Sequence, residues 1–223
     1  MAKERLKSPR ARLFVALDLP DDVRAGIVDW QRTSLVDPAL RIVRPEALHM
    51  TLVFLGYQAE KEAKTIAKQA FDVDSEAPAV ELTAEPVGVP RGKRPRLIAL
   101  AANSDETVSL QQRVEERLVA AGHYKPERRP FWPHLTVARV RAEAPGSRKP
   151  AQVRIPPHPL PEHMFRFFRP TRLVLFKSHL RRMLLLEGRP ARCLRRRDWH
   201  KSGPEFRCRL MTWIILLLQR NKR

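Results

Sequence analysis

Cysteine is almost absent from this chain of 223 residues, which contains only Cys193 and Cys208. Both lie near the C-terminal end, and they do not form a Cys-x-x-Cys unit. A disulfide framework and a cysteine-ligated zinc site are therefore both unsupported. The sequence also lacks a Walker-type glycine loop, a His-Glu-x-x-His helix and a Gly-x-Ser-x-Gly elbow. These absences remove the usual sequence signatures of P-loop proteins, zinc peptidases and α/β-hydrolases.

Long apolar runs are scarce as well. The longest, residues 211–218, is far shorter than the roughly 20 residues that a membrane-spanning helix needs. The charged N-terminus is followed by an apolar stretch, residues 13–17, that is too short for the core of a signal peptide. We therefore expect a cytoplasmic protein with no membrane partner.

Acidic side chains are outnumbered, with 24 Asp and Glu against 43 Lys and Arg, which gives a formal net charge of +19. Such a charge attracts polyanions, so RNA or DNA is the first candidate partner. A solvated, arginine-rich surface is the alternative reading of the charge. The excess is strongest in residues 188–223, which contain Arg195-Arg196-Arg197.

A His-x-Thr pattern occurs twice, as His49-Met50-Thr51-Leu52 and His134-Leu135-Thr136-Val137. Each copy lies in an apolar, strand-like stretch, at residues 48–56 and 131–140, and each follows an approach that contains proline. Because side chains alternate faces along a strand, the histidine and threonine of each copy share one face. The repetition predicts two equivalent strands that present two histidines to one cleft.

Strand-like and helix-like patterns alternate along the chain. Further strands are predicted at residues 13–17, 80–83, 97–101 and 173–178, and helices at 23–35, 60–71 and 104–121. Asp21 or Asp22 can cap the first helix, and Ser104 can cap the third. The first motif strand is expected to end at Gly56.

Paired histidines and threonines suit phosphoryl chemistry without a metal. Opening a phosphodiester requires a base for water, an acid for the leaving oxygen and donors for the phosphate oxygens. Histidine is the side chain that most readily exists in both protonation states near pH 7. The alternative is that His49 and His134 are core residues satisfied by backbone groups. The other five histidines have no partner pattern, so structural or surface roles are expected for them.

The motif segments, residues 44–56 and 131–139, resemble the two signatures of the 2H phosphoesterases, and most closely those of the RNA 2′,3′-cyclic phosphodiesterase, or 2′-5′ RNA ligase-like, branch. Phe14-Val15-Ala16-Leu17 and Leu175-Phe176-Lys177-Ser178 match this family too, so the resemblance covers residues 11–180. It implies an α/β (α+β) bilobal fold with a pseudo-twofold axis, in which two antiparallel-rich sheets flank a central cleft and helices lie outside. It also implies hydrolysis of RNA or nucleotide 2′,3′-cyclic phosphates to 2′-phosphomonoesters, with no metal and no cofactor.

By motif position, the resemblance makes His49 the general acid for the departing 3′-oxygen and His134 the general base for water. Thr51 and Thr136 would bind the phosphate. The family also implies that Arg139 and Phe54 help to bind the nucleotide. Strict alternation, however, places both of these on the face opposite the histidines, unless a bulge or a strand end intervenes.

We divide the chain into a flexible basic lead-in at residues 1–10, a bilobal catalytic domain at 11–187, and a basic tail of unknown order at 188–223. The family usually ends on a tyrosine-bearing strand. This chain departs from that pattern, although residues 184–186 could supply the strand. A monomer is expected. The rival functions are an RNA-binding protein without turnover and a 2′-5′ RNA end ligase that uses the same cleft.

Overall fold

The computed structural model describes residues 9–164, 167–178 and 183–190. The expected lead-in and basic tail lie largely outside these residues, although β1 begins at Arg10 and the last strand continues to Pro190. The strands and helices follow in this order: β1 (Arg10–Asp18), α1 (Asp21–Ser34), β2 (Leu40–Ile42), η1 (Pro45–Ala47), β3 (His49–Ala59), η2 (Glu60–Glu62), α2 (Ala63–Phe71), β4 (Glu81–Val89), β5 (Leu97–Asn103), α3 (Asp105–Ala120), β6 (His134–Val140), η3 (Glu162–Met164), β7 (Arg172–Ser178) and β8 (Met183–Pro190).

The strands form one antiparallel sheet with the order β4-β5-β6-β3-β1-β7-β8, and β2 also pairs with β6. β8 supplies the strand that residues 184–186 were expected to provide. The predicted mixture of strands and helices with an antiparallel-rich sheet is confirmed. The two sheets expected from the family resemblance are continuous, because β3 and β6 are joined through Met50 and Leu135.

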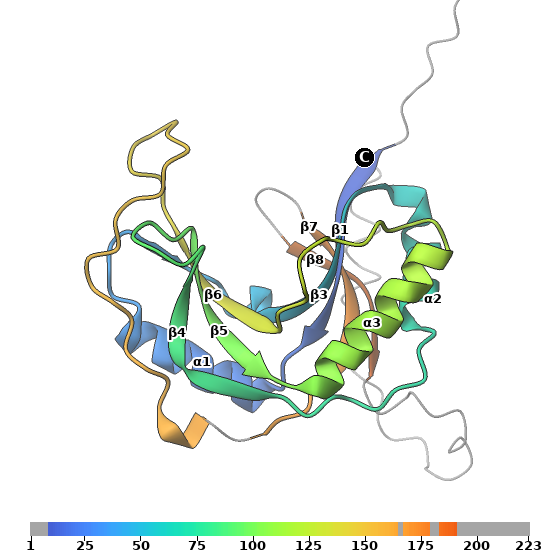
Figure 1. Cartoon of the computed structure of the whole chain (residues 1–223), viewed down its shortest axis with the longest axis horizontal. Helices are drawn as coiled ribbons and strands as arrows, with labels where there is room; N and C mark the ends of the chain where they lie inside the picture. The colour runs from blue at the N-terminus through green and yellow to red at the C-terminus, as the bar shows by residue number, and fades with distance from the viewer. Residues whose placement is uncertain (1–8, 165–166, 179–182, 191–223) are drawn as a thin grey trace, which may run out of the picture.

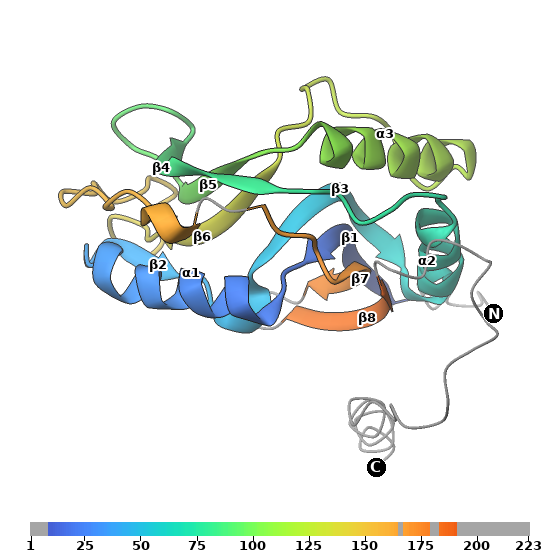
Figure 2. The same ribbon diagram turned by 90° about the horizontal axis from the view of Figure 1, so that it is seen from below.

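The sheet is strongly curled, so that β4 and β5 face β1 and β7 across its inner side (Figure 1). We call this inner side the concave face. Helix α1 lies outside one half of the sheet, whereas α2 and α3 lie beside each other outside the other half (Figures 1 and 2). A core of buried apolar side chains from the sheet and the helices holds these layers together.

Each half of the sheet is covered by a helix from the other half of the sequence. Helix α1 follows β1, yet its buried Gln31 donates to the carbonyl of Val137 on β6. Helix α3 follows β5, yet its Arg117 pairs with Asp72, which directly follows α2. The two halves of the chain are therefore interlocked rather than arranged as two successive units.

Each of the three predicted helices is present. Val23, Ile27 and Trp30 of α1 are buried. Ser104 caps α3, accepting a hydrogen bond from the Thr107 amide at 3.0 Å, as predicted. The predicted aspartate cap of α1 is wrong, because the helix begins at Asp21 itself. Asp21 and Asp22 lie in the first turn, where their negative charges interact favourably with the helix dipole. No helix in the described part of the chain is long and apolar enough to cross a membrane.

The prediction that the first motif strand ends at Gly56 is also wrong. β3 continues to Ala59, and Gly56 has a φ of 67° at an irregularity in its pairing with β1. Glycine adopts this left-handed conformation without a steric penalty, so the strand bends there and continues.

Candidate active site

The two motif strands lie side by side at the centre of the sheet. Met50 of β3 is paired with Leu135 of β6, and both side chains are fully buried in the core. The antiparallel register then sets His49 opposite Thr136 and Thr51 opposite His134. The motif side chains are half-buried on the concave face. The structure thus brings together all four residues that the sequence singled out.

Both imidazoles are held by the same backbone contact. Nδ1 of His49 donates to the carbonyl oxygen of Ala47 at 2.8 Å, and Nδ1 of His134 donates to that of Trp132 at 2.8 Å. A carbonyl can only accept, so in each neutral ring the proton lies on Nδ1. Nε2 is therefore the atom that can exchange a proton with a bound substrate.

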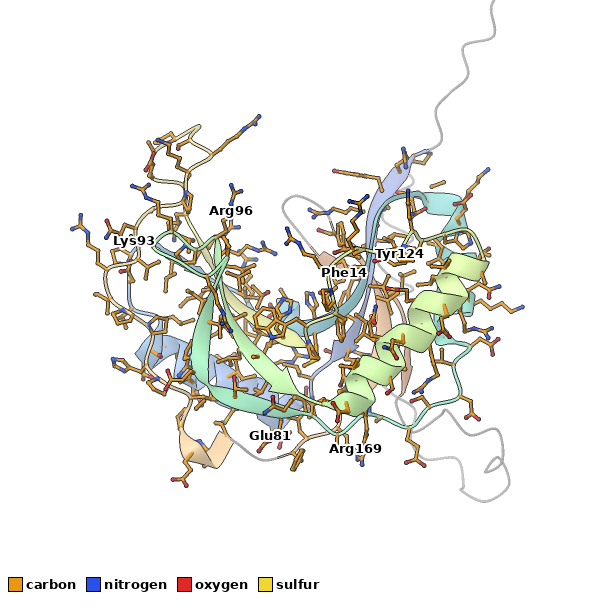
Figure 3. The ribbon with its side chains drawn as sticks, viewed as in Figure 1. Phe14, Glu81, Lys93, Arg96, Tyr124 and Arg169 are labelled. Carbon is orange, nitrogen blue, oxygen red and sulfur yellow. The ribbon has the colours of Figure 1, made fainter. Side chains whose placement is uncertain are left out.

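The two rings have different surroundings. His49 stacks on Phe14 with ring centroids 4.9 Å apart and lies 5.2 Å from the ring of Phe176. Phe14, which is labelled in Figure 3, belongs to a small buried cluster on the concave face that also contains Ala16, Val174 and Phe176. His134 instead stacks on Trp132 at 4.5 Å, and that indole is 36% exposed. One histidine is enclosed by apolar rings and the other faces a more open surface.

This enclosure sets the protonation state of His49. Burial lowers its pKa to about 4, and the positive charges of Arg139 and His134 act in the same direction. The hydrogen bond to Ala47 and the charge of Asp18 oppose the shift without cancelling it. Without substrate, His49 is therefore a neutral imidazole at pH 7.

Two equivalent bulges bring Phe54 and Arg139 to the face of the histidines. Leu52 is an extra residue in the pairing of β3 with β1, and Val137 is an extra residue in the pairing of β6 with β5. From the histidine onward, both strands show the same sequence of burial: half-buried, buried, half-buried, buried, buried, exposed. The expectation from strict alternation is therefore wrong, because a bulge reverses the faces that follow it.

Neighbouring contacts agree with this placement. The guanidinium of Arg12 lies over the ring of Phe54, 4.5 Å from its centroid. Arg12 and Phe14 are two residues apart in a stretch of β1 that pairs regularly with β7, so they share a face, and Phe14 stacks on His49.

The bulge in β6 is fixed from outside the sheet. The Val137 carbonyl accepts hydrogen bonds from the Val43 amide and from Nε2 of Gln31, both at 2.9 Å. Gln31 is only 2% exposed, so its side-chain amide has little contact with solvent and bonds to the protein instead. The sequence signal for this contact is a glutamine within the helix predicted at residues 23–35.

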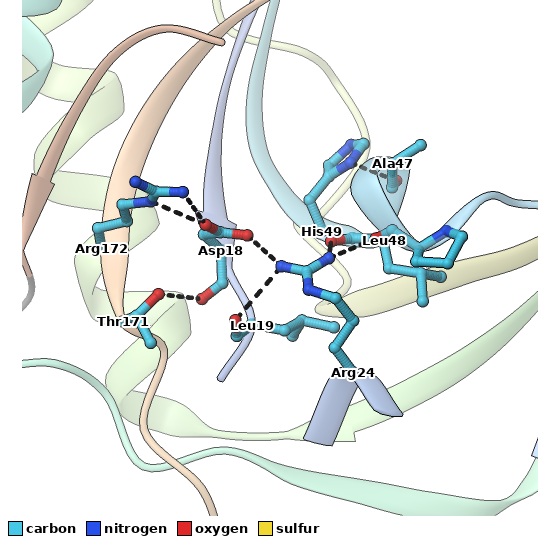
Figure 4. Close-up of polar contacts among 9 residues, drawn as sticks. Asp18, Leu19, Arg24, Ala47, Leu48, His49, Thr171 and Arg172 are labelled. Carbon is cyan, nitrogen blue, oxygen red and sulfur yellow. Dashed lines mark hydrogen bonds and ion pairs between the residues drawn. The ribbon is translucent and has the colours of Figure 1, made fainter. Parts of the chain in front are cut away.

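A second network supports the turn before His49 (Figure 4). Arg24 of α1 pairs with the carboxylate of Asp18 and donates to the carbonyls of Pro45 and Leu48. Arg172 pairs with the other oxygen of the same carboxylate at 2.7 Å. The network therefore holds the η1 turn, whose Ala47 carbonyl orients the imidazole. The sequence did not indicate this network because Arg172 and the η1 turn are far from Asp18 and Arg24 along the chain.

The described side chains offer no evident metal centre. Within the ranges that the structure describes, no group of three or more His, Cys, Asp or Glu side chains is placed so that it could hold a metal ion. The two histidines are accompanied by threonine hydroxyls and an arginine instead. Hydroxyl and guanidinium groups are donors suited to phosphate oxygens.

Comparisons with known proteins agree with this arrangement. A sequence model described as the 2′-5′ RNA ligase superfamily matches residues 19–180. The RNA 2′,3′-cyclic phosphodiesterase of Escherichia coli K12 is 30% identical over 135 residues, which cover 60% of this chain and 74% of that protein. The enzyme of the same name from Methanothermobacter thermautotrophicus is 33% identical, over 59% of this chain and 72% of its own length.

Solved structures show the same fold. The crystal structure of TT0787 of Thermus thermophilus matches with a TM-score of 0.65 and 26% identity, covering 81% of this chain and 98% of the other. The crystal structure of Escherichia coli LigT complexed with 3′-AMP matches with a TM-score of 0.62 and 24% identity, over 82% and 98% of the two chains.

Proposed function

Because this chain belongs to the 2′-5′ RNA ligase superfamily, we propose that it hydrolyses RNA 2′,3′-cyclic phosphate ends to 2′-phosphomonoesters. The observation that carries the proposal is the pairing of Met50 with Leu135, which sets two His-x-Thr motifs against each other on one face. Relatives named RNA 2′,3′-cyclic phosphodiesterase, at about 30% identity over most of their length, support the same activity.

In the proposed reaction the two histidines act on opposite sides of the phosphorus. Nε2 of His134 takes a proton from water as the water oxygen bonds to phosphorus. The bond between phosphorus and the 3′-oxygen breaks, and Nε2 of His49 gives its proton to that oxygen. The products are a 2′-phosphomonoester and a free 3′-hydroxyl. Each proton transfer contributes roughly a hundredfold to ten-thousandfold in rate.

His49 must first gain the proton that it donates. Its pKa of about 4 leaves it neutral in the free site. A cyclic phosphate carries one negative charge, and an anion beside an imidazole favours the protonated ring. We infer that substrate and proton bind together, so that the imidazolium forms only when a leaving oxygen is present.

The remaining residues bind rather than transfer protons. Thr51 and Thr136 share the concave face with the histidines, and their hydroxyls would donate to the phosphate oxygens. Phe54 and Arg139, placed on this face by the two bulges, would contact the nucleotide. No step assigned to these side chains requires a metal ion or a cofactor.

The test is an assay with adenosine 2′,3′-cyclic phosphate in the presence of a chelator, with the product identified. Release of the 2′-phosphate that survives chelation and is lost in both His49→Ala and His134→Ala supports the proposal. Exposed His163 on η3 offers the matched control, because His163→Ala should leave turnover unchanged. Dependence on a metal ion, or formation of a 3′-phosphate, would refute the mechanism.

The two rival functions give different results in the same assay. A protein that only binds RNA retains affinity for the cyclic phosphate but releases no product. A 2′-5′ RNA end ligase, given a second RNA in the same assay, uses the 5′-hydroxyl of that RNA in place of water. The bond between phosphorus and that 5′-oxygen forms as the bond to the 3′-oxygen breaks, so its product grows in length. A monomeric state and a cytoplasmic location stay predictions, to be tested by light scattering and cell fractionation.

A further inference from the structure

Three arginines cluster beyond the two histidines on the concave face. Arg41 of β2 is the direct cross-strand partner of Arg139 on β6, so their side chains leave the same face of the sheet. Arg12 of β1 comes from the other half of the sheet and lies over Phe54. Partial burial and the charges of Arg41 and Arg12 lower the pKa of Arg139, which is consistent with all three being close together.

In the part of the chain that the structure describes, these three guanidiniums lack an acidic ion-pair partner. Some arginines elsewhere in the described chain pair with carboxylates, as Arg94 does with Glu143 and Arg172 with Asp18. Among the described residues, no carboxylate forms an ion pair with Arg12, Arg41 or Arg139. Like charges that approach without a counterion repel one another, so the cluster favours a bound anion.

The cluster extends outward from the reacting phosphate. Arg139 follows Thr136 by three positions along β6, on the far side of the bulge at Val137. The Arg139 charge still reaches His49, whose pKa it lowers. Arg41 is the cross-strand partner of Arg139, and Arg12 lies over Phe54. Arg41 and Arg12 belong to strands that carry neither His-x-Thr motif. The nucleotide that carries the cyclic phosphate would therefore lie between the histidines and these two arginines.

We propose that Arg12 and Arg41 form a second phosphate-binding site, which takes the phosphate on the 5′-oxygen of the terminal nucleoside. This inference rests on the proposed function. The cyclic phosphate lies at the 3′ end of an RNA, so the rest of the chain continues from that 5′-oxygen. Guanidinium groups bind phosphate through paired, charge-assisted hydrogen bonds. The site distinguishes an RNA end, or any 5′-phosphorylated nucleotide, from a bare nucleoside cyclic phosphate.

Four substrates test whether the second site binds a 5′-terminal phosphate, the phosphate that links two nucleotides, or both. They are adenosine 2′,3′-cyclic phosphate, its 5′-phosphorylated form, the dinucleotide that ends in the same cyclic phosphate, and that dinucleotide with an uncharged methylphosphonate linkage. We expect kcat/KM for the 5′-phosphorylated form and for the dinucleotide to exceed that for the bare nucleotide by roughly tenfold to a hundredfold. The methylphosphonate should lose this advantage.

Substitutions of the two arginines test whether they cause the higher kcat/KM of the 5′-phosphorylated substrate. Arg41→Gln and Arg12→Gln should each reduce the ratio of kcat/KM between the 5′-phosphorylated and bare nucleotides toward one. Arg32→Gln is the matched control, since Arg32 is an exposed arginine of α1 that pairs with Asp29, and it should leave the ratio unchanged. A wild-type ratio near one, or a ratio that survives both substitutions, overturns the proposal.

Binding measurements keep this test independent of turnover. Adenosine 2′,5′-bisphosphate should bind the wild type roughly tenfold or more tightly than adenosine 2′-monophosphate, and Arg41→Gln should remove the difference. Equal affinity for the two compounds overturns the second site even if hydrolysis is observed. Conversely, a wild type that binds the bisphosphate more tightly but hydrolyses no cyclic phosphate retains the second site and refutes the proposed function.

Discussion

Met50 and Leu135 are paired across β3 and β6, and this contact between two buried side chains sets the geometry of the site. Because the strands are antiparallel, each histidine lies opposite the threonine of the other motif. A one-residue shift in this register would move the histidine and threonine of one motif from the concave face to the core face. Because Met50 or Leu135 would then leave the core, their burial disfavours such a shift.

The two histidines should respond differently to the leaving group. We expect His49→Ala and His134→Ala each to lower kcat by roughly a hundredfold to ten-thousandfold with the natural cyclic phosphate. With sulfur in place of the 3′-oxygen, the thiolate departs without a proton, because thiols are far more acidic than alcohols. The defect of His49→Ala should then shrink below about tenfold, while that of His134→Ala persists. The reverse pattern would exchange the two roles.

The pH–rate profile should be bell-shaped, with limbs that belong to the coupled histidine pair. For kcat/KM, which reports the free enzyme, we expect one limb near pH 4, the pKa of His49. For kcat, which reports the bound state, this limb should lie at higher pH, because the bound phosphate favours the imidazolium. Measurements from pH 3 to 9 test both statements, and identical limbs in the two profiles would contradict proton uptake with substrate.

Folding stability should fall in acid because of His49. The folded pKa is about 4, whereas an unfolded histidine titrates near 6.5. Below pH 6.5 the unfolded chain binds a proton that the native ring does not, so stability decreases as pH falls from 6.5 through 4, by up to about 3 kcal/mol. Urea unfolding at several pH values should show this loss in the wild type and in His163→Gln, but reduced in His49→Gln. An equal loss in His49→Gln would assign it to other groups.

Arg24 should act on turnover through His49. Arg24→Met removes the hydrogen bonds to Asp18 and to the carbonyls of the η1 turn. We expect kcat to fall by roughly tenfold to a hundredfold with KM little changed, since a small displacement of a catalytic group is costly. Nitrogen chemical shifts of the His49 ring should report the loss of the Nδ1 contact, and Arg24→Lys should restore part of kcat. Arg32→Met on the same helix is the control, and equal defects in the two methionine variants would rule out a positioning role.

Much of the architecture followed from local patterns. The helix-like pattern of residues 23–35 predicted α1, and Ser104 predicted the start of α3, because these signals depend on neighbours within one or two turns of helix. The two His-x-Thr motifs were visible in the sequence for the same reason, since a period of two is a local property of a strand.

Other features depended on contacts between distant segments. The bulges at Leu52 and Val137 could be allowed for but not located, because a bulge is defined by the partner strand. One of them is held by Gln31 from a helix more than 100 positions away along the chain. The interlocked packing of α1 and α3, and the clustering of Arg12 with Arg41 and Arg139, depend in the same way on how the sheet closes.

The sequence by itself thus determined which residues carry the chemistry: two histidines and two threonines, each pair sharing the face of a strand. Only the tertiary structure decided what these residues become. The rings of Phe14, which stacks on His49, and of Phe176, which lies beside it, enclose His49 and so lower its pKa, and the two bulges bring Phe54 and Arg139 to the same face. Strand periodicity is encoded over a few residues, whereas burial and pairing register arise only when distant segments meet.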